Sequence, residues 1–107
     1  MTEFELYIMI FQALDHYWDK HQGEALGMFL SGMNPFLFQG EGSAVPDYYI
    51  SYQRFIGGRT ITVRNSFDLA MAYIKDLDKD YITEAFAWVE RDAWMEKAMK
   101  MFQGHKS

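Results

Sequence analysis

The sequence TEFELYIMIFQALDHYWDK, residues 2–20, decides the fold because it combines a helix start with an apolar stripe. Thr2 is followed three residues later by Glu5, the spacing of a capping box, in which each side chain satisfies a backbone N–H of the first turn. Behind this cap, apolar residues recur at helical spacing, as one face of an amphipathic helix requires: Phe4, Tyr7, Ile8, Phe11, Leu14 and Trp18. The pattern predicts a helix that runs to about His21 and stops near Gly23.

A second helix is predicted from residue 24 to about residue 33. Its apolar residues share one side: Leu26, Phe29, Leu30 and Met33. Gly27 and Gly32 lower the intrinsic helicity of this segment but allow a neighbouring element to approach closely. Pro35 ends the helix, because proline lacks the backbone N–H and restricts the residue before it.

The segment GMFLSGMNPFLFQGEGSAVPDYYISY, residues 27–52, carries apolar and aromatic residues through a region that proline and glycine divide. We expect an apolar loop around residues 34–45. Loops are usually polar and exposed, so the Phe36–Phe38 run must be covered by something. Two interpretations stand at this point: the run folds back into the core of the chain, or it forms a surface that another protein covers.

The segment after the loop predicts a third helix, with Pro46 at its first position and glycines 57 and 58 at its end. Residues 59–64, RTITVR, alternate polar with β-branched side chains, which favours a short strand or an extended connector. A lone strand has no partner to pair with, so we interpret this segment as a connector.

The C-terminal part predicts two further helices. Asn65 and Ser66 are residue types that cap helices, and we expect them to begin a fourth helix at residues 67–77. A fifth helix is expected over about residues 81–102, with two apolar sides that require two packed neighbours or a partner. The predicted fold is therefore all-α, a compact bundle of four to five helices that forms a single globular domain over residues 1–107.

The amino-acid composition excludes several kinds of site and disfavours several kinds of partner. The chain has 107 residues and no cysteine, which excludes disulfides and thiolate metal sites and favours the cytoplasm. No apolar stretch is long enough for a membrane span, and Glu3 and Glu5 stand where a secretory signal needs basic residues. The formal net charge is −5, and residues 1–53 hold seven acidic residues against Lys20 alone. We therefore expect no membrane or nucleic-acid partner and a preference for basic proteins.

Candidate catalytic and metal-binding residues are few. His16 and His21 lie five residues apart, about 140° around a helix, so they do not share a face. Only His21 and Glu24 have a spacing that lets them converge, and two ligands do not define a metal site. Ser43 lies in a glycine-rich loop, but this loop has neither the lysine of a phosphate-binding loop nor the pattern of a nucleophile elbow. We therefore expect no enzyme activity, no cofactor and no metal.

Three arginines follow a cluster of tyrosines, the residue types that bind the backbone and bases of nucleic acid: Arg54, Arg59, Arg64, Tyr48, Tyr49 and Tyr52. Three basic residues in an acidic chain are few for binding nucleic acid. Packing of the tyrosines in a helix, with the arginines paired to nearby acids, is the preferred interpretation.

Three segments of the chain together resemble a known class: LGMFLSGMNPFLFQGEGSAVPDYYISY, FDLAMAYIKDL and EAFAWVERDAWMEKAMKMF. They are similar to small bacterial domains found among the immunity proteins of polymorphic toxin systems, mainly in Gram-positive bacteria. The resemblance implies a non-enzymatic protein that binds and blocks a cognate toxin, and it assigns no functional residues. An acidic N-terminal half agrees with this function, because acidic inhibitors are steered to basic toxins.

The partner surface is expected to combine exposed acids with aromatic anchors, as interface hot spots do. The predicted partner-binding residues are Phe36, Phe38, Glu41, Asp47 and Tyr48. The alternative function is a structural or self-associating helical domain. In that case a homodimer is expected to bury Trp88, Met95 and Met99.

Overall fold

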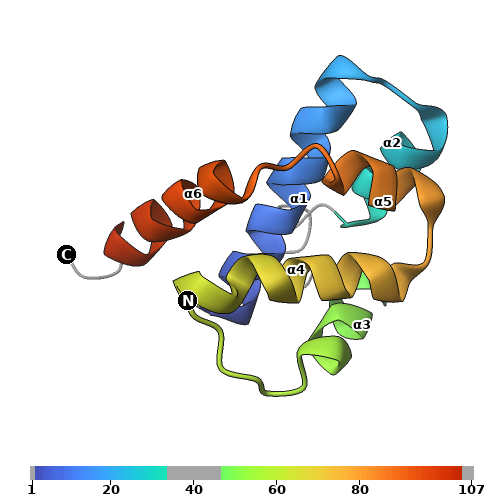
Figure 1. The fold of residues 1–107 in the computed structure, drawn as a ribbon. Helices are drawn as coiled ribbons and strands as arrows, with labels where there is room; N and C mark the ends of the chain where they lie inside the picture. Colours follow the sequence, from blue (N-terminus) through green and yellow to red (C-terminus); the bar gives the residue numbers. More distant parts are fainter. Residues whose placement is uncertain (1, 34–46, 105–107) are drawn as a thin grey trace.

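The computed structural model describes residues 2–33 and 47–104, and the regular elements in these ranges are all α-helices. Their bounds are α1 Glu3–Lys20, α2 Glu24–Met33, α3 Asp47–Ile56, α4 Val63–Leu77, α5 Asp80–Phe86 and α6 Arg91–Gly104. Figure 1 shows them wrapped around α1, with α6 extending to one side. The predicted all-α fold is confirmed. The described ranges contain six helices rather than four or five, because the expected last helix is divided in two.

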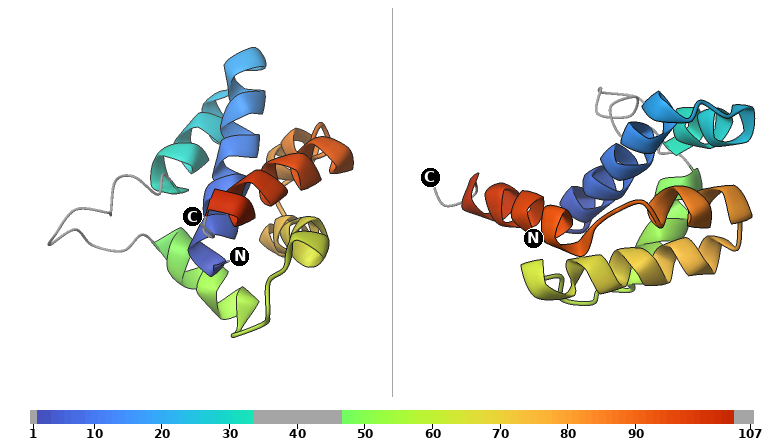
Figure 2. Two further views of the ribbon diagram at one scale, coloured as in Figure 1. Left: turned by 90° about the vertical axis from the view of Figure 1, so that its left-hand side faces the viewer. Right: turned by 45° about the horizontal axis from the view of Figure 1, so that its top comes forward.

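Helix α1 begins with the predicted capping box. The Glu5 backbone N–H donates to Thr2 Oγ1 at 3.1 Å, and the Thr2 N–H donates to Glu5 Oε1 at 2.6 Å. Most of one side of the helix is buried: Leu6, Tyr7, Met9, Ile10, Phe11 and Leu14. Since α2, α3, α4 and α5 all contact α1, this helix forms the centre of the core (Figure 2).

Helix α2 has the predicted bounds and buries the four predicted residues. Its last carbonyl, at Met33, accepts a 2.6 Å hydrogen bond from the buried Tyr7 hydroxyl of α1. At Gly32, an added Cβ would lie 2.7 Å from Tyr48 Cε2, which confirms that glycine here lets α3 approach α2. The aromatic ring of Tyr48 also packs against Phe29, with the ring centroids 4.7 Å apart.

A cluster of buried tyrosines joins α1, α3 and α4. The rings of Tyr7 and Tyr52 lie 5.1 Å apart, and those of Tyr52 and Tyr73 lie 5.3 Å apart. The Tyr52 hydroxyl donates to the Glu3 carbonyl, so the apolar rings are buried while their hydroxyls keep partners. Burial raises the pKa of Tyr73 to about 12 and raises the pKa values of Tyr7 and Tyr52 further, because the charged phenolate loses its hydration.

Helix α4 begins earlier than the sequence analysis predicted. Thr62 is the N-cap, and its hydroxyl accepts from the Asn65 N–H at 3.1 Å while Asn65 Oδ1 accepts from the Thr62 N–H at 2.8 Å. Asn65 and Ser66 therefore lie inside the helix, and their prediction as caps was wrong. Before this cap, Gly57 and Gly58 take positive φ values of 56° and 78°, as expected at the end of α3. The connector predicted for residues 59–64 covers only residues 59–62, because residues 63 and 64 belong to α4.

The predicted helix over residues 81–102 is interrupted at residues 87–90. The Trp88 N–H bonds to the Ala85 carbonyl at 3.3 Å and the Val89 N–H to the Phe86 carbonyl at 3.0 Å, both i to i−3 bonds that tighten and end α5. This break lets α5 pack against α1 and α4 while α6 packs against α4. On α6 the buried apolar side chains are Trp94 and Ala98, whereas Ala93 and Met99 are exposed, so the two apolar sides predicted for one helix are not both buried.

Buried aromatic packing fixes α6 to α4 and α5. Trp94 lies 5.8 Å from Phe67 and 5.7 Å from Phe86 between ring centroids. Its indole N–H donates to Ser66 Oγ at 2.9 Å, and Ser66 in turn donates to the Val63 carbonyl at 2.9 Å. Among the described residues, Ser66 is the one fully buried polar residue, and these two bonds satisfy its hydroxyl.

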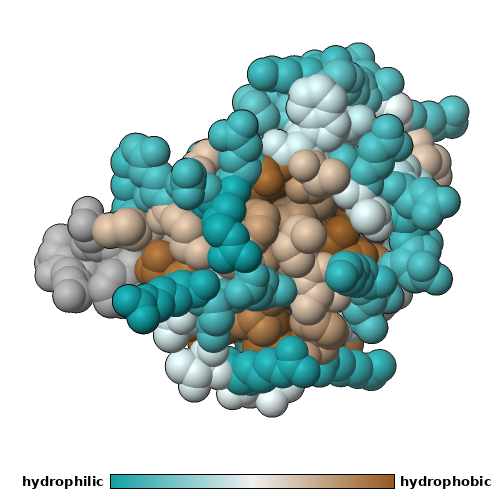
Figure 3. Space-filling model, in the orientation of Figure 1, coloured by the Kyte–Doolittle hydropathy of each residue, from teal (hydrophilic) through white to brown (hydrophobic). Residues whose placement is uncertain are grey.

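The surface retains apolar regions. On the face shown in Figure 3, apolar side chains gather at the centre and hydrophilic residues surround them. Within residues 2–33 and 48–100, the large exposed apolar side chains are Met28, Ile50, Trp88 and Met99. No helix in these ranges is both long enough and apolar enough to cross a membrane.

Candidate functional site

The turn between α1 and α2 is closed by Trp18. Its indole Nε1 donates to the Gly23 carbonyl at 3.1 Å, and the same nitrogen would lie 3.0 Å from a Cβ added at Gly27. The His21 N–H donates to the Tyr17 carbonyl at 2.9 Å and caps α1. Because residue 27 has no side chain, the indole lies directly against α2 and holds the two helices together.

A groove of about 460 Å³ lies beside this turn. We call it the Met28 groove, and the lining residues that matter here are Asp15, Trp18, Glu24, Gly27, Met28 and Leu30. Met28 is 71% exposed, the largest exposed fraction among the large apolar side chains described. The charged residues that line the groove are Asp15 and Glu24, both acidic. The Met28 groove therefore offers an adaptable apolar contact with negative charge beside it.

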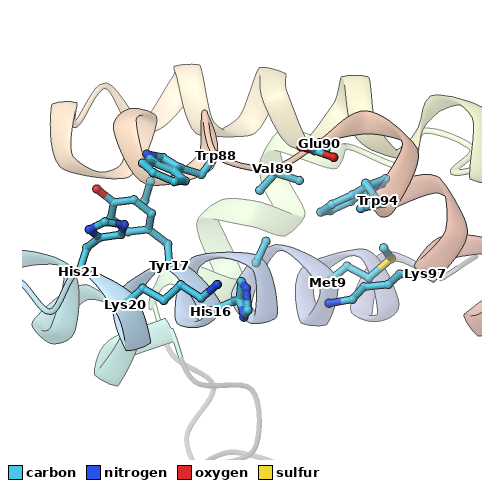
Figure 4. A pocket seen from close by; sticks show the side chains of 13 residues that line it. Met9, His16, Tyr17, Lys20, His21, Trp88, Val89, Glu90, Trp94 and Lys97 are labelled. Carbon is cyan, nitrogen blue, oxygen red and sulfur yellow. The ribbon is translucent and has the colours of Figure 1, made fainter.

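A second groove lies between α1 and the segment that joins α5 to α6, with a volume of about 500 Å³ (Figure 4). We call it the Trp88 groove, and its apolar lining consists mainly of Met9, Ala13, Ala85, Val89, Ala93 and Trp94. Residues of an α-helix advance by about 100° each, so Asp15 and Trp18 face the opposite side of α1 from Met9, Ala13 and His16. Helix α1 thus separates the two grooves.

Trp88 stands at one end of the second groove and is 64% exposed. Its ring centroid lies 4.9 Å from that of His21 and 5.9 Å from that of Tyr17, and the rings of Tyr17 and His21 stack 4.6 Å apart. These contacts hold the exposed indole against the C-terminal end of α1. A large aromatic side chain is therefore fixed in place with much of its surface open to solvent.

The charges of the Trp88 groove are unevenly placed. In Figure 4 the ammonium groups of Lys20 and Lys97 point toward one another, and the His16 ring lies between them in the view. Glu90 contributes the one carboxylate among the lining residues described, from the opposite wall. Neither lysine forms an ion pair with another described residue. This groove therefore has a cationic edge, although the whole chain has a formal net charge of −5.

The predicted partner-binding residues are only partly described. Phe36, Phe38 and Glu41 lie outside the described residues, and Asp47 begins α3. Tyr48 is half-buried, and its ring covers Gly32 and contacts Phe29 on α2.

Neither groove is predicted from the sequence. The second apolar side of the predicted last helix already indicated that Trp88 needs a partner or remains exposed. Nothing in the sequence indicated that Lys20 and Lys97 lie on one groove, because they are 77 positions apart in the chain. Their approach depends on the break between α5 and α6, and no glycine or proline in residues 81–102 marks that break.

The histidines and carboxylates weighed as metal ligands stay apart. His21, whose spacing from Glu24 allowed the two to converge, lines the Trp88 groove, while Glu24 lines the Met28 groove. Among the side chains that the structure describes, no three histidines or carboxylates are grouped so as to hold a metal ion.

Comparison of the chain with protein-family models, with curated proteins and with solved structures finds no match in any of the three.

Proposed function

We propose that this protein is a non-enzymatic protein-binding domain, an immunity-type inhibitor that binds and blocks a basic bacterial toxin domain. The observation that carries the proposal is the Met28 groove. It places a 71% exposed methionine beside two carboxylates, Asp15 and Glu24, and its described lining holds no basic residue.

Each part of this groove suits a basic protein partner. Methionine has a flexible, polarizable side chain and is common at binding surfaces that adapt to their partners. Exposed carboxylates raise the association rate of a basic protein and disfavour acidic competitors. The acidic composition of residues 1–53 acts in the same direction.

The predicted loop surface and the Met28 groove are linked through α2. Tyr48 packs on Phe29 and Gly32, and Met28 lies on the same helix. A partner that contacts the groove can therefore extend to Tyr48, and Glu41 and Asp47 remain predicted contributors of negative charge.

The proposal is tested by affinity purification of the tagged protein from the cells that produce it, with mass spectrometry of what remains after a moderate salt wash. The wild type is compared with Asp15→Lys/Glu24→Lys and with a matched control, Asp76→Lys/Asp80→Lys, which reverses two exposed acids outside the groove. We expect one stoichiometric partner with a secretion module and a basic C-terminal domain, lost from the first variant and kept by the control.

Recovery of the bait alone under every growth condition would overturn the inhibitor proposal. A partner lost equally from both charge variants would instead show a general charge effect and exclude the Met28 groove. A third variant, Glu41→Lys/Asp47→Lys, tests the predicted loop surface: weaker association without a lower melting temperature is expected, and unchanged affinity removes these two residues from the surface.

A self-associating helical domain is the second candidate function. The observation in its favour is that Trp88 and Met99 are 64% and 52% exposed. Sedimentation velocity over a wide concentration range measures it directly. A dimer that Trp88→Ser/Met99→Ser converts to monomer supports this second function, and a monomer at all concentrations excludes it.

A further inference from the structure

The Trp88 groove combines two chemically distinct parts. One is a long apolar surface made by residues of α1, α5 and α6 together with Val89. Its α1 side extends from Met9 to Lys20, which corresponds to about 16 Å at 1.5 Å per residue. The other is the cationic edge formed by Lys20 and Lys97 (Figure 4). A ligand that satisfies both parts must carry an extended apolar chain and a negative group.

We propose that the Trp88 groove binds a single-chain aliphatic carboxylate, the chemical class of fatty acids. The aliphatic chain lies against Ala13, Val89 and Trp94, and the carboxylate accepts hydrogen bonds from Lys20 and Lys97. The volume of about 500 Å³ falls within the range of small-molecule sites. The proposal goes beyond the inhibitor function and is independent of it, because the two grooves lie on opposite sides of α1.

The charges that line the Trp88 groove favour a ligand with a carboxylate. Glu90 is the one acidic residue among the described lining, although the chain contains 15 acidic residues, and it lies on the wall opposite the lysines. The two ammonium groups form no ion pair with described residues, so a ligand carboxylate displaces no internal partner. Hydrogen bonds between ammonium and carboxylate groups are among the stronger ones in proteins, and the apolar wall beside them reduces competition from water.

Trp88 and Trp94 give the site its own spectroscopic signal, since both line the groove. Dodecanoate is the probe, titrated below its micelle concentration while tryptophan fluorescence and amide chemical shifts are recorded. Dodecyltrimethylammonium is the matched probe with the same chain and the opposite charge. We expect dodecanoate to saturate one site and to shift the amides of residues 9–20 and 85–97, and we expect the ammonium probe to bind at least about tenfold more weakly.

Two variants test the two parts of the site. Lys20→Glu/Lys97→Glu is expected to weaken dodecanoate binding by about tenfold or more, whereas Lys75→Glu/Lys79→Glu, which makes the same change at exposed lysines elsewhere, is expected to leave it within about twofold. Ala93→Phe fills the apolar part from an exposed position and is expected to abolish binding. Circular dichroism and melting temperature establish that each variant is folded.

Several results would overturn the proposal. These are equal affinity for the two probes, equal weakening by the two lysine variants, or no saturable shift at the groove residues. A concentration-dependent dimer that protects Trp88 and leaves dodecanoate unbound would overturn it in favour of a second copy of the chain. None of these results alters the test of the inhibitor function, which uses other residues and a different binding partner.

Discussion

The indole N–H of Trp94 on α6 donates a 2.9 Å hydrogen bond to the Ser66 hydroxyl on α4, and both groups are buried. This contact holds the first turn of α6 in place, where α6 also provides one wall of the Trp88 groove. At the surface, Arg91 adds a 2.7 Å ion pair with Asp68, but both side chains are more than half exposed, so the pair contributes little stability. The buried contacts of α6 come from Trp94 and Ala98.

Ser66→Ala is expected to destabilise the fold by about 1–3 kcal/mol, because the Trp94 N–H keeps its burial and loses its acceptor. Chemical denaturation measures the change. Ser51→Ala, at an exposed serine, is the control and is expected to change stability by less than about 0.5 kcal/mol. In the background Trp94→Phe, which has no indole donor, the cost of Ser66→Ala should shrink; an undiminished cost would show that the hydrogen bond is not its cause.

Tyr7→Phe is expected to cost about 1–2 kcal/mol. The substitution keeps the aromatic ring in the core but removes the hydroxyl that donates to the Met33 carbonyl at the end of α2. Urea unfolding at neutral pH provides the measurement. Hydrogen exchange adds a local readout, since amides near the end of α2 should lose protection more than those of α6. Uniform loss of protection would argue against a local role for this bond.

Gly32→Ala is expected to destabilise the protein although alanine is the better helix former by about 1 kcal/mol. The new Cβ would lie 2.7 Å from the Tyr48 ring, which is packed against Phe29 and must move. Ser31→Ala, at the exposed neighbour, is the control. If the steric reason is right, Gly32→Ala should become neutral or stabilising in the Tyr48→Ala background.

Thr62→Ala is expected to cost about 1 kcal/mol, because it removes the acceptor for the Asn65 N–H in the first turn of α4. Thr60→Ala, two residues earlier and also exposed, serves as the matched control. Thermal unfolding followed by circular dichroism compares the two. Equal melting temperatures for both variants would contradict the assignment of Thr62 as the cap.

Stability is expected to fall above about pH 10. Folding raises the pKa of Tyr73 from 10.0 to about 12 and raises the pKa values of Tyr7 and Tyr52 as well, so the folded protein retains protons that the unfolded chain releases. The contribution of these groups to stability is fully present below pH 10 and is lost as the pH rises through the folded-state pKa values. Unfolding at fixed denaturant across pH 8–12 measures this loss. Tyr73→Phe is expected to flatten the dependence between about pH 10 and pH 12.

Elements specified by neighbouring residues were predictable. The capping box at Thr2 and Glu5, the bounds of α2 and the positive φ values of Gly57 and Gly58 follow from contacts within one helical turn, so sequence spacing is sufficient. The early start of α4 also had a local signal, since Thr62 lies three residues before Asn65. That signal was missed because asparagine is an unusual partner in a capping box, where glutamate or glutamine is typical.

The sequence by itself determined an all-α chain, its central amphipathic helix and an N-terminal half rich in acidic residues. Only the tertiary structure decided that the last predicted helix breaks at residues 87–90 and that Lys20 and Lys97 lie on one groove while Asp15 and Glu24 lie on another. The physical reason is the distance along the sequence over which each kind of interaction acts. Caps and apolar stripes act between residues within about four positions of each other, whereas a groove is formed by side chains from distant segments that meet only when the core has packed.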